Sequence, residues 1–283
     1  MMMRAPVSQD VGARHASPLH DTGNFLSVTG LAKIYPSRAG AIVALKEVSL
    51  AVGTTQFVSL LGPSGCGKST LLRCVAGLER PTAGSIVLSG RAVTDPPRDM
   101  GVVFQRDVLL DWLTVLGNIL LPARIRRLPL PEWRDKAARL LAMIGLEGYA
   151  NRYPWELSGG MRQRVAICRA LLLDPALLLM DEPFGALDAM TRDELNLELQ
   201  RLWLADAKTV LFVTHSIAEA VFLSDKVVIM SPSPGRVVDI VKVELARPRA
   251  LAVRETADFA HYVARIRTIF EGFGLLRGSH VGE

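Results

Sequence analysis

A glycine-rich segment near the start of the chain carries most of the information about its fold, and it reads Gly62-Pro63-Ser64-Gly65-Cys66-Gly67-Lys68-Ser69-Thr70. It directly follows the apolar run 57–61, which is typical of a buried strand. A strand that enters a glycine-rich turn ending in Lys-Ser predicts a phosphate-binding loop. The backbone N–H groups of the turn and the N-terminus of the next helix would hold phosphate oxygens. We therefore expect residues 62–70, the phosphate loop, to bind a nucleoside triphosphate.

Three side chains of the phosphate loop have separate expected roles. Lys68 would place a positive charge at the β and γ phosphates, and Ser69 would offer a hydroxyl oxygen to Mg²⁺. Cys66 lies near a helix N-terminus and a lysine, which are conditions that lower a thiol pKa. The interpretation we favour is that Cys66 is a small filler. Together with Cys74 and Cys168 it shows no zinc-site spacing, so we expect free thiols in a reducing compartment.

Composition indicates a soluble α/β chain. The 283 residues are 49% hydrophobic, yet the longest apolar runs fall far short of the ~18 residues that suggest a membrane span. Residues 1–23 mix charges, histidines and prolines without the apolar core of a signal peptide, so we expect a disordered cytoplasmic tail.

The order of patterns along the chain predicts one core that closes around an insertion. Strand-like runs precede and follow a mostly helical region, about 105–165, and the later runs each follow a helical segment, as a parallel α/β sheet requires. We expect a core over 24–240 and a C-terminal extension, 241–283, with an amphipathic helix. The expected strands are 25–28, 42–50, 57–61, 177–180, 209–213, 226–230 and 237–243, and the expected helices of the insertion are 109–125 and 131–144.

Two adjacent carboxylates, Asp181 and Glu182, end the apolar run 177–180. Successive side chains of a strand point in different directions, so each carboxylate can have its own function. Asp181 would help to hold Mg²⁺, while Glu182 would polarise the water that attacks the γ-phosphate. The alternative is an exposed acidic turn before Pro183.

The segment Leu157-Ser158-Gly159-Gly160-Met161-Arg162-Gln163-Arg164 resembles the signature motif of ABC-transporter ATPase subunits. The order of the other motifs is similar to that family as well: the phosphate loop, Gln105, the signature, Asp181-Glu182, Ala186-Leu187-Asp188 and His215. The resemblance implies a P-loop NTPase (RecA-like) α/β core, an antiparallel β subdomain and an inserted α-helical signature subdomain. It also implies ATP and Mg²⁺ as cofactors.

Further site residues follow from the resemblance. Gln105 would help to hold Mg²⁺ and take part in catalysis, and His215 would contact the γ-phosphate and help to hold the water at Glu182. The alternative for His215 is a hydrogen-bonded structural histidine. Tyr35 occupies the place of the aromatic residue that stacks on adenine, and stacking on a base contributes about 1–3 kcal/mol in other contexts. The alternative for Tyr35 is simple packing at a strand end.

The signature segment reads as a second phosphate-binding helix start. Ser158 is a good N-cap, and Gly159 and Gly160 let the backbone approach an anion closely. The resemblance implies that two subunits lie head to tail, with each signature closing over the ATP of its partner. We expect this ATPase dimer to be a homodimer.

The resemblance also implies membrane partners. The helical insertion, with Gln105 and Trp112, resembles the subdomain that docks a helix of a membrane subunit, although Trp112 could instead fill the subdomain core. We expect no membrane domain fused to the chain, which in this respect resembles bacterial importers built from separate subunits. We expect two membrane-spanning permease subunits, a solute-binding protein, and a peripheral location on the cytoplasmic face of the inner membrane. Segments 112–118, 181–197 and 231–236 look like the nitrate, sulfonate and taurine branch, whose solutes are small anions.

Two other function classes remain open. The net charge of +5 permits contact with nucleic acid, but the basic cluster Arg124, Arg126, Arg127, Arg134 and Lys136 is interleaved with aliphatic residues and favours a solvated helix face. We therefore expect no nucleic-acid partner. A soluble ABC ATPase acting on nucleic acid or the ribosome would show long coiled-coil insertions or tandem cores, which are not seen. A regulatory module without turnover would not need Glu182 and His215.

Overall fold

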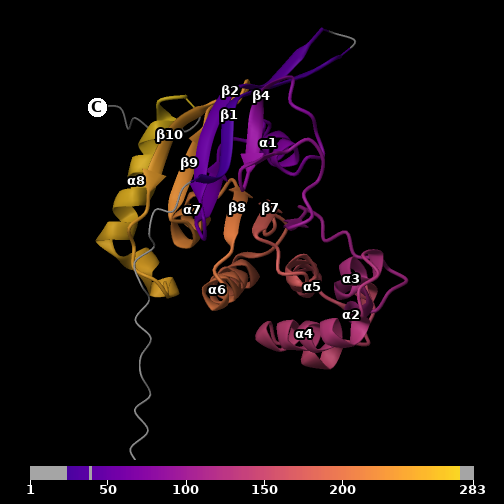
Figure 1. The fold of residues 1–283 in the computed structure, drawn as a ribbon. Coiled ribbons are helices and arrows are strands. Elements are labelled where there is room, and N and C mark those ends of the chain that lie inside the picture. Colours follow the sequence, from indigo (N-terminus) through magenta and orange to yellow (C-terminus); the bar gives the residue numbers. More distant parts are fainter. Residues whose placement is uncertain (1–23, 38–39, 275–283) are drawn as a thin grey trace, which may run out of the picture.

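The computed structural model describes residues 24–37 and 40–274, and it contains two sheets (Figure 1). The expectation of a disordered tail at residues 1–23 lies outside the described residues. The first sheet is antiparallel, with strand order β2-β1-β4-β5. Its strands are β1 (Asn24–Tyr35), β2 (Ile42–Gly53), β4 (Ala83–Leu88) and β5 (Arg91–Ala92).

The second sheet has six strands in the order β10-β9-β3-β8-β7-β6. Five of them are parallel, and β10 pairs antiparallel with β9 after the turn at residues 231–235. The two sheets confirm the expected fold class. The strands are β3 (Phe57–Leu61), β6 (Met100–Val103), β7 (Leu177–Asp181), β8 (Thr209–Thr214), β9 (Lys226–Met230) and β10 (Val237–Lys242).

The central strands are buried on both faces, which explains their unbroken apolar runs. Phe57 and Leu61 of β3 pack into one hydrophobic cluster with the helical insertion, α6 and α7. Val58 and Leu60 point the other way, into a second cluster with α1 and the antiparallel sheet. The parallel sheet thus separates two cores. The helices outside the insertion are α1 (Lys68–Val75), α6 (Ala189–Ala205), α7 (Ile217–Leu223) and α8 (Ala257–Glu271).

The helical insertion differs from its prediction at one end. Its helices are α2 (Val115–Ile119), α3 (Leu121–Ile125), α4 (Leu130–Met143) and α5 (Gly159–Leu171), with short 3₁₀ turns η1 (Glu147–Tyr149) and η2 (Pro154–Glu156). Residues 109–114 are not helical, because the buried Asn118 side chain binds backbone groups of Leu110 and Leu113 and Thr114 caps α2. A polar side chain has taken backbone partners that a helix would have used.

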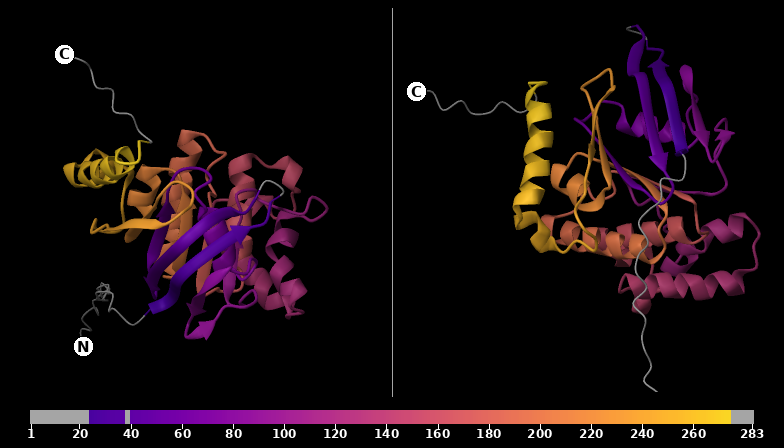
Figure 2. Two further views of the ribbon diagram at one scale, coloured as in Figure 1. Left: turned by 90° about the horizontal axis from the view of Figure 1, so that it is seen from above. Right: turned by 60° about the vertical axis from the view of Figure 1, so that its left-hand side comes forward.

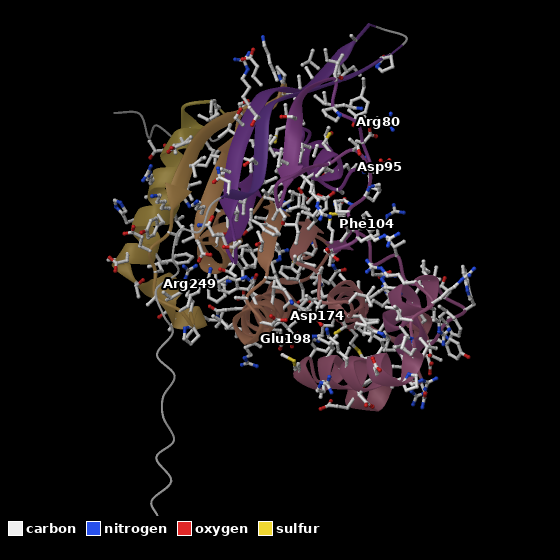
Figure 3. All side chains as sticks on the ribbon, in the orientation of Figure 1. Arg80, Asp95, Phe104, Asp174, Glu198 and Arg249 are labelled. Atoms are coloured by element: carbon white, nitrogen blue, oxygen red, sulfur yellow. The ribbon has the colours of Figure 1, made fainter. Side chains whose placement is uncertain are left out.

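The C-terminal helix is amphipathic as predicted and packs on its own chain. Phe259, Ile266 and Phe270 of α8 are buried, and α8 contacts α7 on the opposite side of the core from the helical insertion (Figure 2). Before α8, the 3₁₀ turn η3 (Leu251–Glu255) follows Arg249, a buried arginine between this segment and the core (Figure 3). Within residues 24–37 and 40–274, no helix combines the length and apolar character of a membrane span.

Candidate functional site

The phosphate loop joins β3 to α1, and its glycines adopt conformations that other residues avoid. Gly65 has φ 76° and Gly67 has φ 100°, both in the left-handed region. Lys68 is 4% exposed, and its Nζ donates to the carbonyl oxygens of Gly62 (2.8 Å) and Pro63 (3.1 Å). The loop therefore curls around the Lys68 amine, which is the shape the sequence predicts for a phosphate cradle.

Asp181, the last residue of β7, lies beside the phosphate loop. The Ser69 hydroxyl donates to Asp181 Oδ1 at 2.8 Å. Burial raises the pKa of Asp181; the Ser69 hydrogen bond opposes this rise, while the charge of Glu182 adds to it. A buried carboxylate and a hydroxyl oxygen are hard donors, and Mg²⁺ is usually held by one or two protein oxygens together with phosphate oxygens. The residues present therefore fit Mg²⁺ bound with a nucleotide.

The Glu182 carboxylate has different partners from Asp181. Its carboxylate lies 3.6 Å from Lys68 Nζ and 3.3 Å from His215 Nδ1. Its backbone is held at φ 44°, an unusual conformation for a non-glycine residue, and its N–H donates to the Val213 carbonyl. The prediction that adjacent carboxylates face separate partners is confirmed, and the exposed-turn alternative is wrong because the Glu182 side chain is 18% exposed.

A buried network supports the turn that carries His215, and this network was not predicted from the sequence. Thr214 Oγ1 donates to Glu219 at 2.6 Å and accepts from the Ser216 N–H at 3.0 Å, while Arg192 pairs with Glu219 at 3.4 Å. Burial raises the pKa of Glu219, against the lowering effects of Thr214 and Arg192. The spacing of Ser216 and Glu219, a serine three residues before a glutamate at a helix start, is the signal that could have revealed it.

Two predicted site residues, Gln105 and Tyr35, have no bond to the side chains of Lys68, Asp181, Glu182 and His215. Gln105 is exposed and follows β6, the strand beside β7, so it lies toward the same edge of the sheet as Asp181. It makes no hydrogen bond or ion pair with the described residues. Tyr35 is half-buried at the end of β1, opposite Ile42, and Lys33 Nζ lies 4.8 Å from its ring centroid.

The signature residues form the start of α5. Ser158 caps the helix by accepting from the Met161 N–H at 3.3 Å, as predicted. Gly160 is buried against α6, where a Cβ would lie 2.6 Å from Thr191 Cγ2, so close packing requires glycine there. Ser158 and Gly159 are exposed, and among the described residues no hydrogen bond joins Ser158, Gly159 or Gly160 to the phosphate loop. Within the part of the chain that the structure describes, the signature segment is therefore not joined to the phosphate loop.

Cys66 behaves as a filler. It is 1% exposed, and burial raises its pKa despite the charge of Lys68, so the conditions expected to lower the pKa are outweighed. All three cysteines are free and buried. Gly235 packs on the loop, which was not predicted from the sequence: a Cβ there would lie 2.0 Å from the Cys66 carbonyl oxygen.

Comparison with known proteins gives consistent results. The ABC transporter family model matches residues 45–185. An uncharacterized ABC transporter ATP-binding protein of Methanocaldococcus jannaschii is 46% identical over 87% of this chain and 91% of its own. The taurine import ATP-binding protein TauB of Rhizobium johnstonii is 44% identical, and the aliphatic sulfonates import ATP-binding protein SsuB of Bacillus thuringiensis is 39% identical, each over 90% of this chain and 99% of its own.

Solved structures agree. A dimeric ATP-binding cassette in a post-hydrolysis state, bound to ADP and Pi, superposes with a TM-score of 0.69 at 35% identity, covering 78% of this chain and all of that one. The fold, the order of motifs and these relatives lead to one conclusion: the chain belongs to the ABC transporter family.

Proposed function

We propose that this chain is the ATP-hydrolysing subunit of an importer for a small anion such as taurine, another sulfonate or nitrate. That it is an importer ATPase rests on relatives named as import ATP-binding proteins. The anion is inferred from the same names and from the resemblance of three sequence segments. The single observation that carries the ATPase role is the meeting of Lys68, Ser69, Asp181, Glu182 and His215 at one edge of the parallel sheet.

Each of these residues has a proposed task. The backbone of the phosphate loop and Lys68 bind the β and γ phosphates, and Ser69, Asp181 and Gln105 hold Mg²⁺. When bound, Mg²⁺ neutralises charge that develops on the phosphate oxygens. Glu182 orients and polarises the attacking water.

The arrangement around Glu182 supports this assignment. Lys68 lies on one side of its carboxylate and His215 on the other, so the side chain is held between two nitrogen groups. His215 would contact the γ-phosphate as well. The Thr214–Glu219–Arg192 network positions the turn on which His215 is carried.

A second copy of the chain would complete each site. Ser158 and Gly159 are exposed at a helix start and have no bond to the phosphate loop of their own chain. In a head-to-tail homodimer, the signature of one subunit would cap the ATP of the other, giving two equivalent sites across a two-fold axis. The solved cassettes with this fold are described as dimeric.

The helical insertion presents a surface suited to permease subunits. Trp112 is 74% exposed and Ile125 is 73% exposed, so Trp112 does not fill the subdomain core. Exposed apolar side chains on one subdomain favour a protein interface. We propose that two membrane-spanning subunits dock on this insertion, that a solute-binding protein delivers the anion, and that the ATPase lies peripherally on the cytoplasmic face of the membrane.

The test is isolation of the assembly from native membranes with the tagged chain. We expect a permease and a solute-binding protein to co-purify, and ATP hydrolysis in proteoliposomes to rise when the binding protein carries taurine or an alkanesulfonate. Lys68→Ala should abolish this hydrolysis, whereas Lys242→Ala, an exposed lysine on β10, should not. Stimulation by a neutral sugar alone would contradict the anion, and co-purification of RNA or ribosomes without a permease would contradict the importer.

A further inference from the structure

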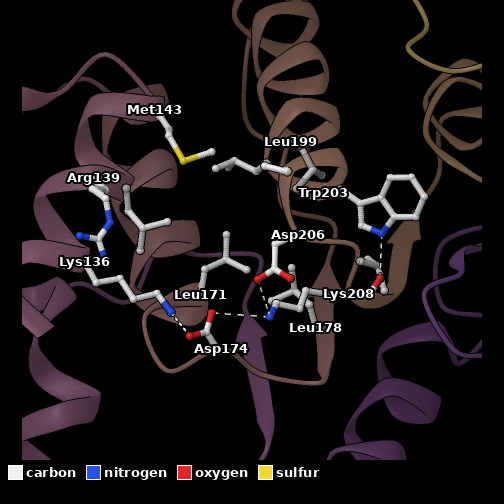
Figure 4. Close-up of a pocket in the computed structure, with 14 residues that line it drawn as sticks. Lys136, Arg139, Met143, Leu171, Asp174, Leu178, Leu199, Trp203, Asp206 and Lys208 are labelled. Carbon is white, nitrogen blue, oxygen red and sulfur yellow. Dashed lines mark hydrogen bonds and ion pairs between the residues drawn. The ribbon is translucent and has the colours of Figure 1, made fainter. Parts of the chain in front are cut away.

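A cavity lies between the helical insertion and the core (Figure 4). It is at the opposite end of the parallel strands from Asp181 and the phosphate loop. Leu178 at the start of β7 and Val210 at the start of β8 line it, whereas Asp181 ends β7 on the far side. Its walls come from helices α4, α5 and α6, strands β7 and β8 and the loops beside them, and its volume is about 210 Å³. We call it the α4–α6 cavity.

The interior of the α4–α6 cavity is apolar. Leu140 of α4 faces Leu199 and Trp203 of α6, and Leu171 at the end of α5 closes the wall between them. The only polar atom of Trp203, its indole N–H, donates to the Lys208 carbonyl at 2.7 Å. The ring therefore presents apolar surface to the cavity, and an apolar lining of this kind suits an apolar group of a ligand.

The rim of the α4–α6 cavity is charged and carries an excess of cations. Asp174 forms ion pairs with Lys136 and with Lys208, and Lys208 also pairs with Asp206 at 2.6 Å. Arg139 lies one turn after Lys136 on α4, and it makes no hydrogen bond or ion pair with the described residues (Figure 4). Three cations thus face two carboxylates, and the guanidinium remains available.

An apolar interior below an unpaired guanidinium suits a ligand with an apolar body and an acid group. We propose that the α4–α6 cavity is a binding site for a small organic acid, with its hydrocarbon or aromatic body inside and its acid group on Arg139. A cavity of about 150 Å³ suffices for benzene, so 210 Å³ accommodates one ring with a small substituent or a short acyl chain. A guanidinium binds a carboxylate, sulfonate or phosphate through two parallel hydrogen bonds.

The probe is 4-bromobenzoate, which has one ring and one carboxylate. Crystals of the full chain soaked with it should show an anomalous bromine signal between Leu140 and Leu199, and calorimetry should show saturable binding in solution. Its neutral analogue of the same shape, 4-bromobenzamide, should bind about tenfold more weakly, because it cannot form the charge-assisted pair.

Matched variants separate the two parts of the site. Arg139→Gln should weaken 4-bromobenzoate about tenfold, whereas Arg134→Gln, an exposed arginine on the same helix, should leave its affinity unchanged. Met143→Trp should plug the cavity from its half-exposed rim and abolish binding of both probes without unfolding the chain.

Four results would overturn the proposal. A cavity without bromine signal, or filled by a second copy of the chain, would remove the site. Equal affinity for the acid and the amide, or an unchanged affinity in Arg139→Gln, would remove the acid as its ligand. Each result is independent of ATP hydrolysis, so failure here leaves the proposed transport function untouched.

Discussion

Arg249 is expected to stabilise the fold more than any surface charge, and replacing it with methionine tests this. The side chain is 2% exposed and makes five hydrogen bonds to backbone oxygens, with no carboxylate among them. The acceptors are the carbonyl groups of Val221, Phe222, Ser224 and Leu245. The first three lie at the end of α7, whose last carbonyls have no helical partners and whose dipole favours a cation there.

The expected loss can be estimated from these contacts. Arg249→Met removes the hydrogen-bond donor of four carbonyl groups, which costs about 1 kcal/mol for each group. The variant also no longer buries a charge, and this offsets part of the cost. We expect Arg249→Met to lower the unfolding free energy by about 3 kcal/mol, or the melting temperature by roughly 6–12 °C. Burial lowers the pKa of Arg249 to about 10, so the residue is charged at neutral pH and the loss should be equal at pH 6 and pH 8.

The assay is thermal unfolding followed by circular dichroism, with Arg267→Met as the control. Arg267 is exposed on α8, and its replacement should change the unfolding free energy by less than ~0.5 kcal/mol. A loss of 1 kcal/mol lowers the melting temperature by about 2–4 °C. If the melting temperatures of Arg249→Met and Arg267→Met differ by less than about 2 °C, the argument from buried carbonyl groups is refuted.

Three further predictions address the loop and the core. Gly235→Ala should displace the phosphate loop and lower the rate of ATP hydrolysis, because the new Cβ would lie 2.0 Å from the Cys66 carbonyl oxygen. Gly148→Ala, with open space around it, should keep the normal rate, and equal rates in the two variants would contradict the prediction. Asn196 is fully buried with both side-chain polar atoms unpartnered among the described residues, so Asn196→Leu should raise the unfolding free energy by about 1–2 kcal/mol. Gln200→Leu, which removes two bonds to the Arg249 backbone, should lower it. Burial raises the pKa of Cys66, so less of its thiolate forms at pH 8. Iodoacetamide should therefore react more slowly with the folded chain than with the urea-unfolded chain, and equal rates would contradict the burial of Cys66.

The elements that could be predicted from the sequence are those with strong local patterns. The apolar runs at β3, β7, β8 and β9 are buried on both faces, so period and length alone indicate parallel strands. The phosphate loop has specific residues at fixed spacing, so its place between a strand and a helix could be predicted from the sequence, while its binding of phosphate stays a prediction.

The features that escaped prediction depend on contacts between distant segments. The Ser216–Glu219 spacing marks the helix start that carries Glu219, but Arg192 reaches Glu219 from another helix, so this part of the network has no local pattern. Gly235 is needed only because Cys66 lies against it, far away in the sequence. The local conditions that lower the pKa of Cys66 are outweighed by burial, which is a property of the whole fold, and this agrees with the favoured interpretation of Cys66 as a filler.

The central claim is that Glu182 activates water at an ATP site completed by a second subunit, and one variant tests it most directly. Hydrolysis by Glu182→Gln should be at least about 100-fold slower, while light scattering should show an ATP-dependent dimer that ADP does not support. Glu255→Gln, an exposed glutamate of η3, should keep normal turnover. Undiminished hydrolysis by Glu182→Gln, or a monomer in the presence of ATP and Mg²⁺, would contradict the account.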